Sequence, residues 1–370
     1  MKVYVDVIIP VHNAAHTIEE TVESVMQQSI PDYLISNSNK SSLISSKVCA
    51  DSEPCVTTKL DALGANVKDS YNRFSLKDVQ IDVAICCQND GSTDESLRIL
   101  QNLVEQKQSQ SQSYPLKKKR KTSDAQPRLS SKLLIASNDD NIARGAGAAR
   151  NRAASLRGSQ MPATAGSSST IDSSLYFLCL CDSDDVMHPH RIAHQVSVML
   201  ALPKEERNST LLGSTFDRIP ADSTWHYTQW ANSLTDERLI LEQFRELTIL
   251  QPTWMMTRAR FELLGGYIES SQSALMFSKA EKEAIHHVYK LIHPKYDTLQ
   301  TMRLAEDLRF FYAHLSYPYI DETKEDLCDC EEVKGSLKVI RTTEPLLSYR
   351  HRAGQSQSSS TPRKLLLQLR

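Results

Sequence analysis

Residues 176–190 read YFLCLCDSDDVMHPH, an unbroken apolar run followed at once by three aspartates within four positions. The run over 175–180 has the length and composition of a strand buried on both faces, as in the centre of a parallel sheet. In an open parallel sheet, ligands bind at the carboxyl ends of the strands. We therefore expect Asp182, Asp184 and Asp185 to lie at a ligand site.

Apolar runs alternate with helical patterns through the first half of the chain. Strands are predicted at 3–10, 79–87, 132–136 and 175–180, and helices at 18–25, 94–104 and 146–156. Before the first helix, Thr17 and Glu20 have the spacing of a capping box. This alternation favours an α/β fold with a mainly parallel sheet and helices on both of its faces.

Five polar segments interrupt the pattern, and we interpret them as surface insertions in one domain over residues 1–357, followed by a tail at 358–370. They are 36–78, 105–131, 158–174, 270–300 and 321–336. The second contains a basic run from Lys117 to Lys121, for which nuclear localisation, RNA contact and a solvated loop are all open interpretations.

Composition and the N-terminus narrow the class of protein. Lys and Arg number 43 against 45 Asp and Glu, so the chain is not a globally basic nucleic-acid binder. The N-terminal apolar run is interrupted by Asp6, unlike a signal peptide, and no run approaches the ~18 apolar residues of a membrane span. The eight scattered cysteines are typical of reduced thiols. We therefore expect a cytoplasmic protein.

The aspartates after the buried run predict a metal site. Carboxylates clustered at the end of a buried strand are costly unless a cation lies beside them. Two acidic side chains suit Mg²⁺ or Mn²⁺, with substrate phosphates completing the coordination. The alternative is that the aspartates cap the helix predicted after Pro189. The chain has no P-loop and no complete dinucleotide-binding fingerprint.

Six segments, taken in order, resemble family 2 glycosyltransferases with the GT-A fold. They read VDVIIPVHN, NDGSTDESL, NIARGAGAARN, YFLCLCDSDDVMHPHRI, LLGGYIE and AEDLRFFYAHL. Within the family, PHRIAHQ, WHYTQWANSLT and QPTWMMTRARF resemble a eukaryotic branch whose members are named beta-1,3-N-acetylglucosaminyltransferase-like protein or queuosine-tRNA galactosyltransferase. The resemblance implies a nucleotide-diphospho-sugar transferase with a Rossmann-like, mainly parallel sheet.

The resemblance also implies roles for individual residues. The implied donor-binding residues are Pro10, Val11, His12, Asn13, Asp90, Arg144, Arg150, Asp182 and Ser183. Among them, Asp90 accepts from the uracil ring and Asp182 faces the ribose. The implied ligands of the divalent cation are Asp184, Asp182 and His351. The implied catalytic residues are Glu306 and Asp307, with Asp307 as the base.

Asp307 also has a physical argument of its own. Leu304, Leu308, Phe311 and Leu315 form an apolar helical stripe, and Asp307 lies on its flank in the first turn, where the helix dipole favours a carboxylate. When UDP is displaced, a metal neutralises the leaving diphosphate, and a carboxylate removes the proton of the attacking hydroxyl. A single base with direct attack implies inversion at the anomeric carbon. The alternative is an acidic pair that only begins a helix.

The closing motif departs from the family pattern. That motif often reads Tyr-Arg-x-His, whereas residues 349–352 read YRHR. His351 takes the role of the family's histidine through a local shift, Arg352 replaces it as a phosphate contact, or the segment is an ordinary polar loop.

Aromatic side chains offer candidates for an acceptor site. Trp225, Tyr227 and Trp230 lie close together in sequence, and Trp254 is a further candidate. Aromatic faces stack on sugars and bases, which favours an acceptor platform. The alternative is that these rings form core beneath a lid.

Together these features predict a cytoplasmic, metal-dependent, inverting glycosyltransferase that uses a UDP-sugar. UDP-galactose with a queuosine-bearing tRNA is the preferred pair, following the branch. One alternative transfers N-acetylglucosamine from UDP-GlcNAc to a β-galactoside. Another is a non-catalytic nucleotide-sugar or RNA-binding protein with the same fold, which the shifted His351 favours.

Overall fold

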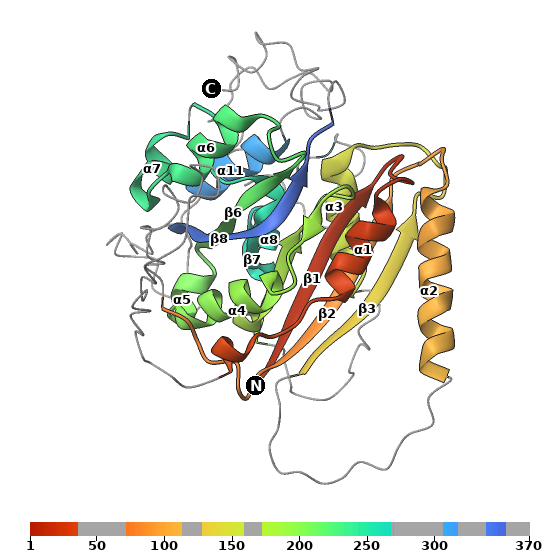
Figure 1. Cartoon of the computed structure of the whole chain (residues 1–370), viewed down its shortest axis with the longest axis horizontal. Helices are drawn as coiled ribbons and strands as arrows, with labels where there is room; N and C mark the ends of the chain where they lie inside the picture. The colour runs from red at the N-terminus through yellow and green to blue at the C-terminus, as the bar shows by residue number, and fades with distance from the viewer. Residues whose placement is uncertain are drawn as a thin grey trace, which may run out of the picture.

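The computed structural model describes residues 1–35, 72–112, 128–158, 172–243, 245–267, 269, 306–316 and 338–352 (Figure 1). These residues form one eight-stranded sheet with the strand order β3-β2-β1-β4-β7-β6-β8-β5. The strands are β1 (Lys2–Val11), β2 (Gln80–Asn89), β3 (Arg128–Ser137), β4 (Tyr176–Leu180), β5 (Val186–Met187), β6 (Thr210–Ile219), β7 (Met255–Thr257) and β8 (Lys338–Arg350).

Most of the strands run in one direction. β1, β2, β3 and β4 are parallel to one another, and β6 and β8 share their direction because β7 is antiparallel to both β4 and β6. Within the described residues, only β7 and β5 run the opposite way. The predicted class, an α/β fold with a mainly parallel sheet, is confirmed.

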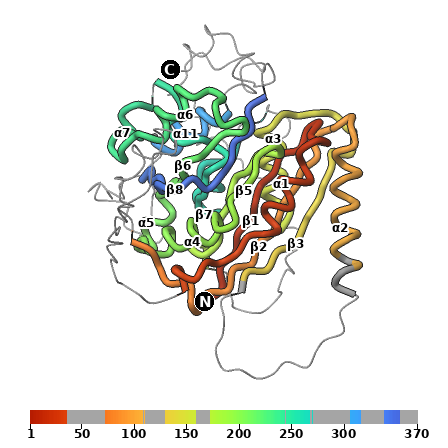
Figure 2. The backbone as a smooth tube through the Cα atoms, in the orientation of Figure 1, coloured from red at the N-terminus to blue at the C-terminus, as the bar shows by residue number. Residues whose placement is uncertain are grey.

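Helices cover both faces of the sheet. They are α1 (Ile18–Met26), α2 (Ser96–Gln112), α3 (Ala146–Ser155), α4 (Arg191–Ala201), α5 (Lys204–Arg207), α6 (Trp225–Ser233), α7 (Asp236–Leu241), α8 (Arg258–Leu263) and α11 (Glu306–Ser316). α1, α2 and α4 bury apolar side chains in one core cluster, whereas α3, α8 and α11 pack into a second. Because successive residues of a strand point to opposite faces, β1 supplies both clusters. Figure 2 traces the blue β8 beside β6, at the far side of the sheet from α2.

The predicted elements are present, with shifted ends. β4 is buried along its whole length and lies between β1 and β7, as expected of a central strand. α2 continues to Gln112 and β3 begins at Arg128, so both extend into the segment 105–131 that was predicted to be an insertion. The apolar residues of α2 all lie in its first half. The helix continues beyond them because Gln and Lys have adequate helix propensity. The other predicted insertions fall mostly outside the described residues, as does the tail at 358–370.

Two further expectations concern the cysteines, expected as reduced thiols, and the absence of a membrane span. Cys86, Cys87, Cys179 and Cys181 are all free and buried. No helix in the described ranges is both long and apolar enough to cross a membrane.

Candidate functional site

The aspartate segment lies where the sequence places it, at the carboxyl end of β4. Cys181 donates its backbone N–H to Ile8 O at 3.1 Å, which holds the segment beside the end of β1. Asp185 N bonds to Asp182 O at 3.3 Å and closes a turn before β5 pairs with β8. The residue that precedes α4 as its N-cap is His190, so none of the aspartates caps that helix. The capping alternative is therefore wrong.

The carboxylates of this segment are crowded and poorly solvated. Burial and the charge of Asp182 raise the pKa of Asp184 to about 6. Asp185 is fully buried, and burial together with its two acidic neighbours raises its pKa well above the ordinary value. One oxygen of Asp185 accepts from Arg350 N at 2.9 Å, and the other has no hydrogen-bond partner among the described residues. Such an arrangement favours a nearby cation.

The end of β8 supplies positive charge to this segment. Arg352 Nε lies 3.2 Å from Asp184 Oδ2, and its Nη2 donates to Thr17 Oγ1 at 2.9 Å. Arg350 Nε donates to Asp184 O at 2.9 Å. His351 is tied in through its backbone, whose N–H donates to Ile219 O at 2.8 Å. Of the two candidates in the closing motif, Arg352 is therefore the side chain that the structure brings to Asp184.

Thr17 corrects a local expectation. It is the N-cap residue of α1, but its side chain accepts no capping hydrogen bond. Its hydroxyl instead donates to Ser183 O at 3.0 Å. Glu20, the other half of the predicted capping box, pairs with Arg350 at 2.6 Å. The capping box is thus wrong, because contacts with the aspartate segment and the end of β8 take both side chains.

The residues present fit a divalent cation held by two carboxylates, but not the predicted set of three ligands. No group of three or more His, Cys, Asp or Glu side chains in the described part of the chain is arranged to hold a metal. The predicted set of His351 with Asp182 and Asp184 is therefore not formed here, and the contact that His351 makes is its backbone N–H to Ile219 O. Mg²⁺ is often held by one or two carboxylates plus substrate phosphates. Asp182 and Asp184, two partly exposed carboxylates of one turn, match that chemistry.

The predicted catalytic pair lies close to the aspartate segment. Glu306 and Asp307 begin α11, and Glu306 Oε1 accepts from Arg150 Nη1 at 3.0 Å. The other end of the same guanidinium donates to Asp182 Oδ1 at 2.6 Å. Burial and the charge of Glu306 raise the pKa of Asp307 to about 7. The arrangement places a carboxylate that titrates near neutral pH beside a second acidic cluster.

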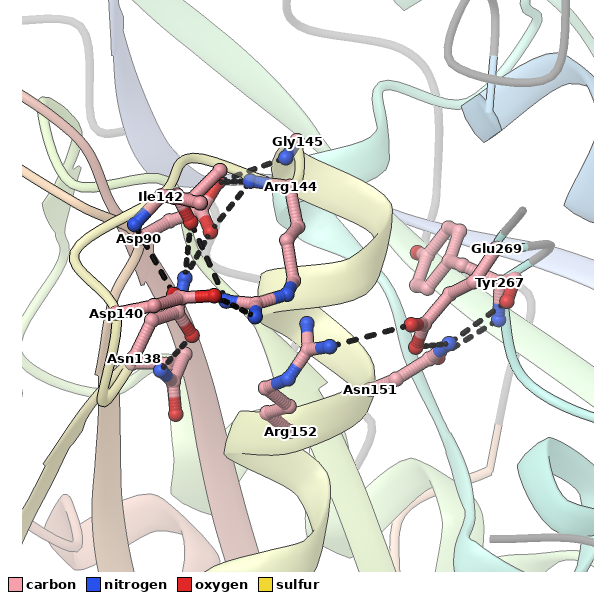
Figure 3. A network of polar contacts seen from close by, with 11 residues as sticks. Asp90, Asn138, Asp140, Ile142, Arg144, Gly145, Asn151, Arg152, Tyr267 and Glu269 are labelled. Carbon is pink, nitrogen blue, oxygen red and sulfur yellow. Dashed lines mark hydrogen bonds and ion pairs between the residues drawn. The ribbon is translucent and has the colours of Figure 1, made fainter. Parts of the chain in front are cut away.

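Gly147 on α3 allows Tyr267 to approach closely. A Cβ on Gly147 would lie 3.1 Å from Tyr267 Cβ and 3.6 Å from Glu306 Cβ. Tyr267 is in turn fixed by Asn151, which donates to Tyr267 O at 2.7 Å and accepts from Tyr267 N at 2.8 Å (Figure 3). The side chain of Arg150 then lies over the Tyr267 ring, 5.4 Å from its centroid.

The loops after β1 and β2 meet at the same edge of the sheet. Asp90 N donates to Val11 O at 2.8 Å, and His12 Nδ1 lies 2.8 Å from Asp90 O. Asn13 has a φ of 49° and accepts from Thr93 N at 2.9 Å. His12 and Asn13 are exposed, whereas Pro10 and Val11 are buried at the end of β1. The Val11 side chain packs in the core, so its predicted role in lining the uracil is wrong for the side chain.

Asp90 holds the loop before α3. Its carboxylate accepts from the backbone N–H groups of Arg144 (2.9 Å) and Gly145 (2.7 Å), and from Asn138 Nδ2 at 2.7 Å (Figure 3). The Arg144 side chain turns to Asp140, with Nη2 and Oδ2 2.6 Å apart. Of the two arginines predicted near the nucleotide, Arg144 serves this loop and Arg150 faces the acidic residues.

The aromatic candidates do not form one platform. Trp254 is fully buried, donates its indole N–H to Ile249 O at 2.9 Å, and stacks on Phe311 at 6.1 Å. Its prediction as an acceptor residue is therefore wrong, because it fills the core beneath α11. Trp230 is partly buried, with its indole N–H bonded to Glu242 at 2.6 Å, whereas Trp225 is half exposed.

The Tyr227 side chain also makes contacts within the protein. Its hydroxyl donates to Leu247 O at 3.0 Å. Its ring lies 6.2 Å from that of Phe216. Of the aromatic candidates, Trp225 is the most exposed.

Arg218 lies near Asp185 although sequence reasoning missed it, and it packs on Tyr349 of the closing motif. They are register partners on β6 and β8, and the guanidinium carbon of Arg218 lies 4.6 Å from the Tyr349 ring centroid. β5, which follows the aspartates directly, pairs with β8 on its other side. Only the pairing of strands that are far apart in sequence brings these residues to the aspartates. No local pattern signals it.

Comparison with known proteins gives a distant structural likeness. No family model matches the sequence. S. aureus TarS 1–349, in complex with UDP-GlcNAc, is 14% identical with a TM-score of 0.44, over 98% of this chain and 62% of that chain. The mannosyltransferase PcManGT from Pyrobaculum calidifontis, in complex with GDP-Man and Mn²⁺, is 14% identical with a TM-score of 0.35, over 74% and 50%. The chain thus spans 62% of the length of the first of these. Similarity at this level establishes no function, which we draw from the residues themselves.

Proposed function

We propose that this chain is a metal-dependent, inverting glycosyltransferase of family 2 that moves a sugar from a UDP-sugar to an acceptor hydroxyl. The observation that carries the proposal is the meeting of two acidic groups at one end of the sheet. Asp182 to Asp185 follow β4, Glu306 and Asp307 begin α11, and Arg150 bonds to a member of each. One group suits the leaving diphosphate and the other suits the attacking hydroxyl.

The leaving-group side has both the carboxylates and the cations that a nucleoside diphosphate needs. Asp184 and Asp182 would hold the divalent cation, which as a Lewis acid would neutralise charge on the departing diphosphate. Arg352, now 3.2 Å from Asp184, would bond phosphate oxygens through charge-assisted hydrogen bonds. The exposed His12 and Asn13 would face the base of the nucleotide.

The acceptor side has one carboxylate with a suitable pKa. With a pKa of about 7, Asp307 is about half ionised at neutral pH, which suits a general base. In this role it takes the proton of the acceptor hydroxyl as the new glycosidic bond forms and the bond to UDP breaks. A single base with direct attack inverts the anomeric carbon.

For the substrates we propose UDP-galactose and a queuosine-bearing tRNA, in the cytoplasm. This choice rests on the sequence segments that resemble the queuosine-tRNA galactosyltransferase branch. The basic run from Lys117 to Lys121, which would suit a tRNA, lies outside the described residues.

The deciding experiment measures transfer of labelled galactose from UDP-galactose to total small RNA with Mn²⁺, for wild type and for Asp307→Asn. Label that enters RNA and is lost in the variant supports the reaction, the donor, the acceptor and the base together. UDP release only with other UDP-sugars keeps the transferase and discards the tRNA acceptor. UDP binding without release from any donor replaces the enzyme with a nucleotide-sugar-binding protein.

A further inference from the structure

Arg150 joins two parts of the site that are far apart in the sequence. It lies on α3, and only 4% of its side chain is exposed. One terminal nitrogen is 2.6 Å from Asp182 Oδ1, and the other is 3.0 Å from Glu306 Oε1. The guanidinium therefore spans the gap between the end of β4 and the first residue of α11.

The surroundings of this side chain hold it in a single place. A buried guanidinium is costly unless it is paired on several sides, and here two carboxylates and the face of the Tyr267 ring surround it. The helix turn before it carries Gly147, whose lack of a Cβ leaves room for Tyr267. Two of its five N–H groups are bonded to these carboxylates, and Nε has no hydrogen-bond partner among the described residues. With only 4% of the side chain exposed, a ligand has little access to the N–H groups that remain.

We infer that Arg150 is a positioning residue, which fixes Glu306, and through it Asp307, relative to Asp182, instead of binding the donor. The inference rests on the proposed function and revises one donor contact that the sequence resemblance implied. Asp307 follows Glu306 in the first turn of α11, so a shift of Glu306 moves the base with it. A misplacement of about 1 Å costs on the order of a hundredfold in rate, even far from the reacting atoms.

Steady-state kinetics of Arg150→Met separate the two roles. We expect kcat to fall about 100-fold while KM for the UDP-sugar stays within about threefold, because the lost contact acts in positioning rather than in ground-state binding. A raised KM with kcat preserved would overturn the inference and return Arg150 to the donor-binding residues. Should Arg150→Met fail to fold, Arg150→Lys serves instead, since one ammonium cannot replace the fork, and the same split is expected.

Arg157 offers a matched control. Its side chain is equally buried, at 3% exposure, and it pairs with the buried Asp6 at 2.7 Å in an ion cluster that also includes Asp82. Arg157→Met should lower the unfolding temperature yet leave kcat of the folded protein near wild type. If it lowers kcat as Arg150→Met does, the loss reflects general destabilisation and the positioning role is refuted.

A double-mutant cycle of unfolding temperatures tests the ion pair between Arg150 and Glu306 without measuring enzyme activity. Arg150→Met and Glu306→Gln should each lower the unfolding midpoint by on the order of 5 °C, whereas the double variant should fall less than the sum, because each removes the other's partner. Additive shifts would refute the tie. A wild type that releases no UDP from any donor would refute the proposed function alone, since the cycle still reports on Arg150 and Glu306.

Discussion

At the scale of the residue, burial and like charge set the chemistry of this site. Asp184, Asp185 and Asp307 all have raised pKa values, because each is desolvated and each has an acidic neighbour. The raised values make these groups available as metal ligands or as a base near neutral pH, at the cost of some stability. Active sites commonly concentrate such perturbed groups.

Asp307 should therefore set the acid limb of the pH profile. Because the ionised form is the active one, kcat should rise with pH through a midpoint of about 7 and then level off. Glu306→Gln removes the like charge and should move the midpoint of that limb to lower pH. The measurement is kcat over pH 5–9, with exposed Glu237→Gln as control. A limb that stays in place in Glu306→Gln would contradict the assignment.

The same shift has a cost in stability, with a definite sign. The folded pKa of about 7 exceeds the ordinary value of 3.8, so the folded state binds the Asp307 proton more tightly than the unfolded chain does. Its contribution to stability is therefore complete below about pH 4 and is lost as pH rises through 7.

At the scale of the element, strand pairing brings the end of β8 to the aspartate segment, from which it is far away in the sequence. β8 runs parallel to β6 and pairs with β5, which follows the aspartates directly. Its last residues therefore lie on the turn that ends β4, with Arg350 bonded to Asp184 O and Arg352 to the Asp184 side chain. A short edge strand thus joins the closing motif to the acidic segment.

Arg352 should matter for the nucleotide more than His351 does. Arg352→Met removes a cation that lies 3.2 Å from Asp184, where the proposed function places the diphosphate, so we expect the Kd for UDP with Mn²⁺ to rise about tenfold. His351→Ala should change it less, since the described contact of this residue to the site is through its backbone. Isothermal titration calorimetry decides between them. A larger loss in His351→Ala would restore His351 as a metal ligand.

At the scale of the whole molecule, the sheet is a rigid frame that brings the candidate site residues together at one edge. The loops after β1, β2 and β4 meet there, and α11 joins them through Arg150. Two core clusters, one on each face, hold the frame. The cluster on the α11 side includes Trp254, Phe310 and Phe311, so Asp307 lies on a helix that is anchored in aromatic core.

A ligand that binds across this edge should stabilise the fold as a unit. UDP with Mn²⁺, each at about 100 times its Kd, should raise the free energy of unfolding by about 2.7 kcal/mol per ligand, measured as a shift of the thermal midpoint. EDTA should remove the metal-dependent part, and Asp184→Asn should show little of it. A UDP-induced shift that is the same with Mn²⁺ and with EDTA would contradict the two-carboxylate metal site.

Much of this protein follows from local pattern. The alternation of apolar runs and helical periods predicts the α/β class, and the unbroken run at 175–180 predicts the central strand, because both depend on burial that each segment encodes by itself. The composition of residues 182–185 likewise points to a ligand site at a strand end.

Other features were decided only by tertiary structure. Trp254, Thr17 and Val11 have sequence contexts that suit a ligand surface, a helix cap and a nucleotide wall, yet long-range packing places them in the core or bonds them elsewhere. The tie from Arg150 to Asp182 and Glu306 spans 32 and 156 positions. A side chain's partners across such separations depend on how strands and helices pack, which no local period contains. Sequence therefore determined which residues could do chemistry, and packing decided which of them meet.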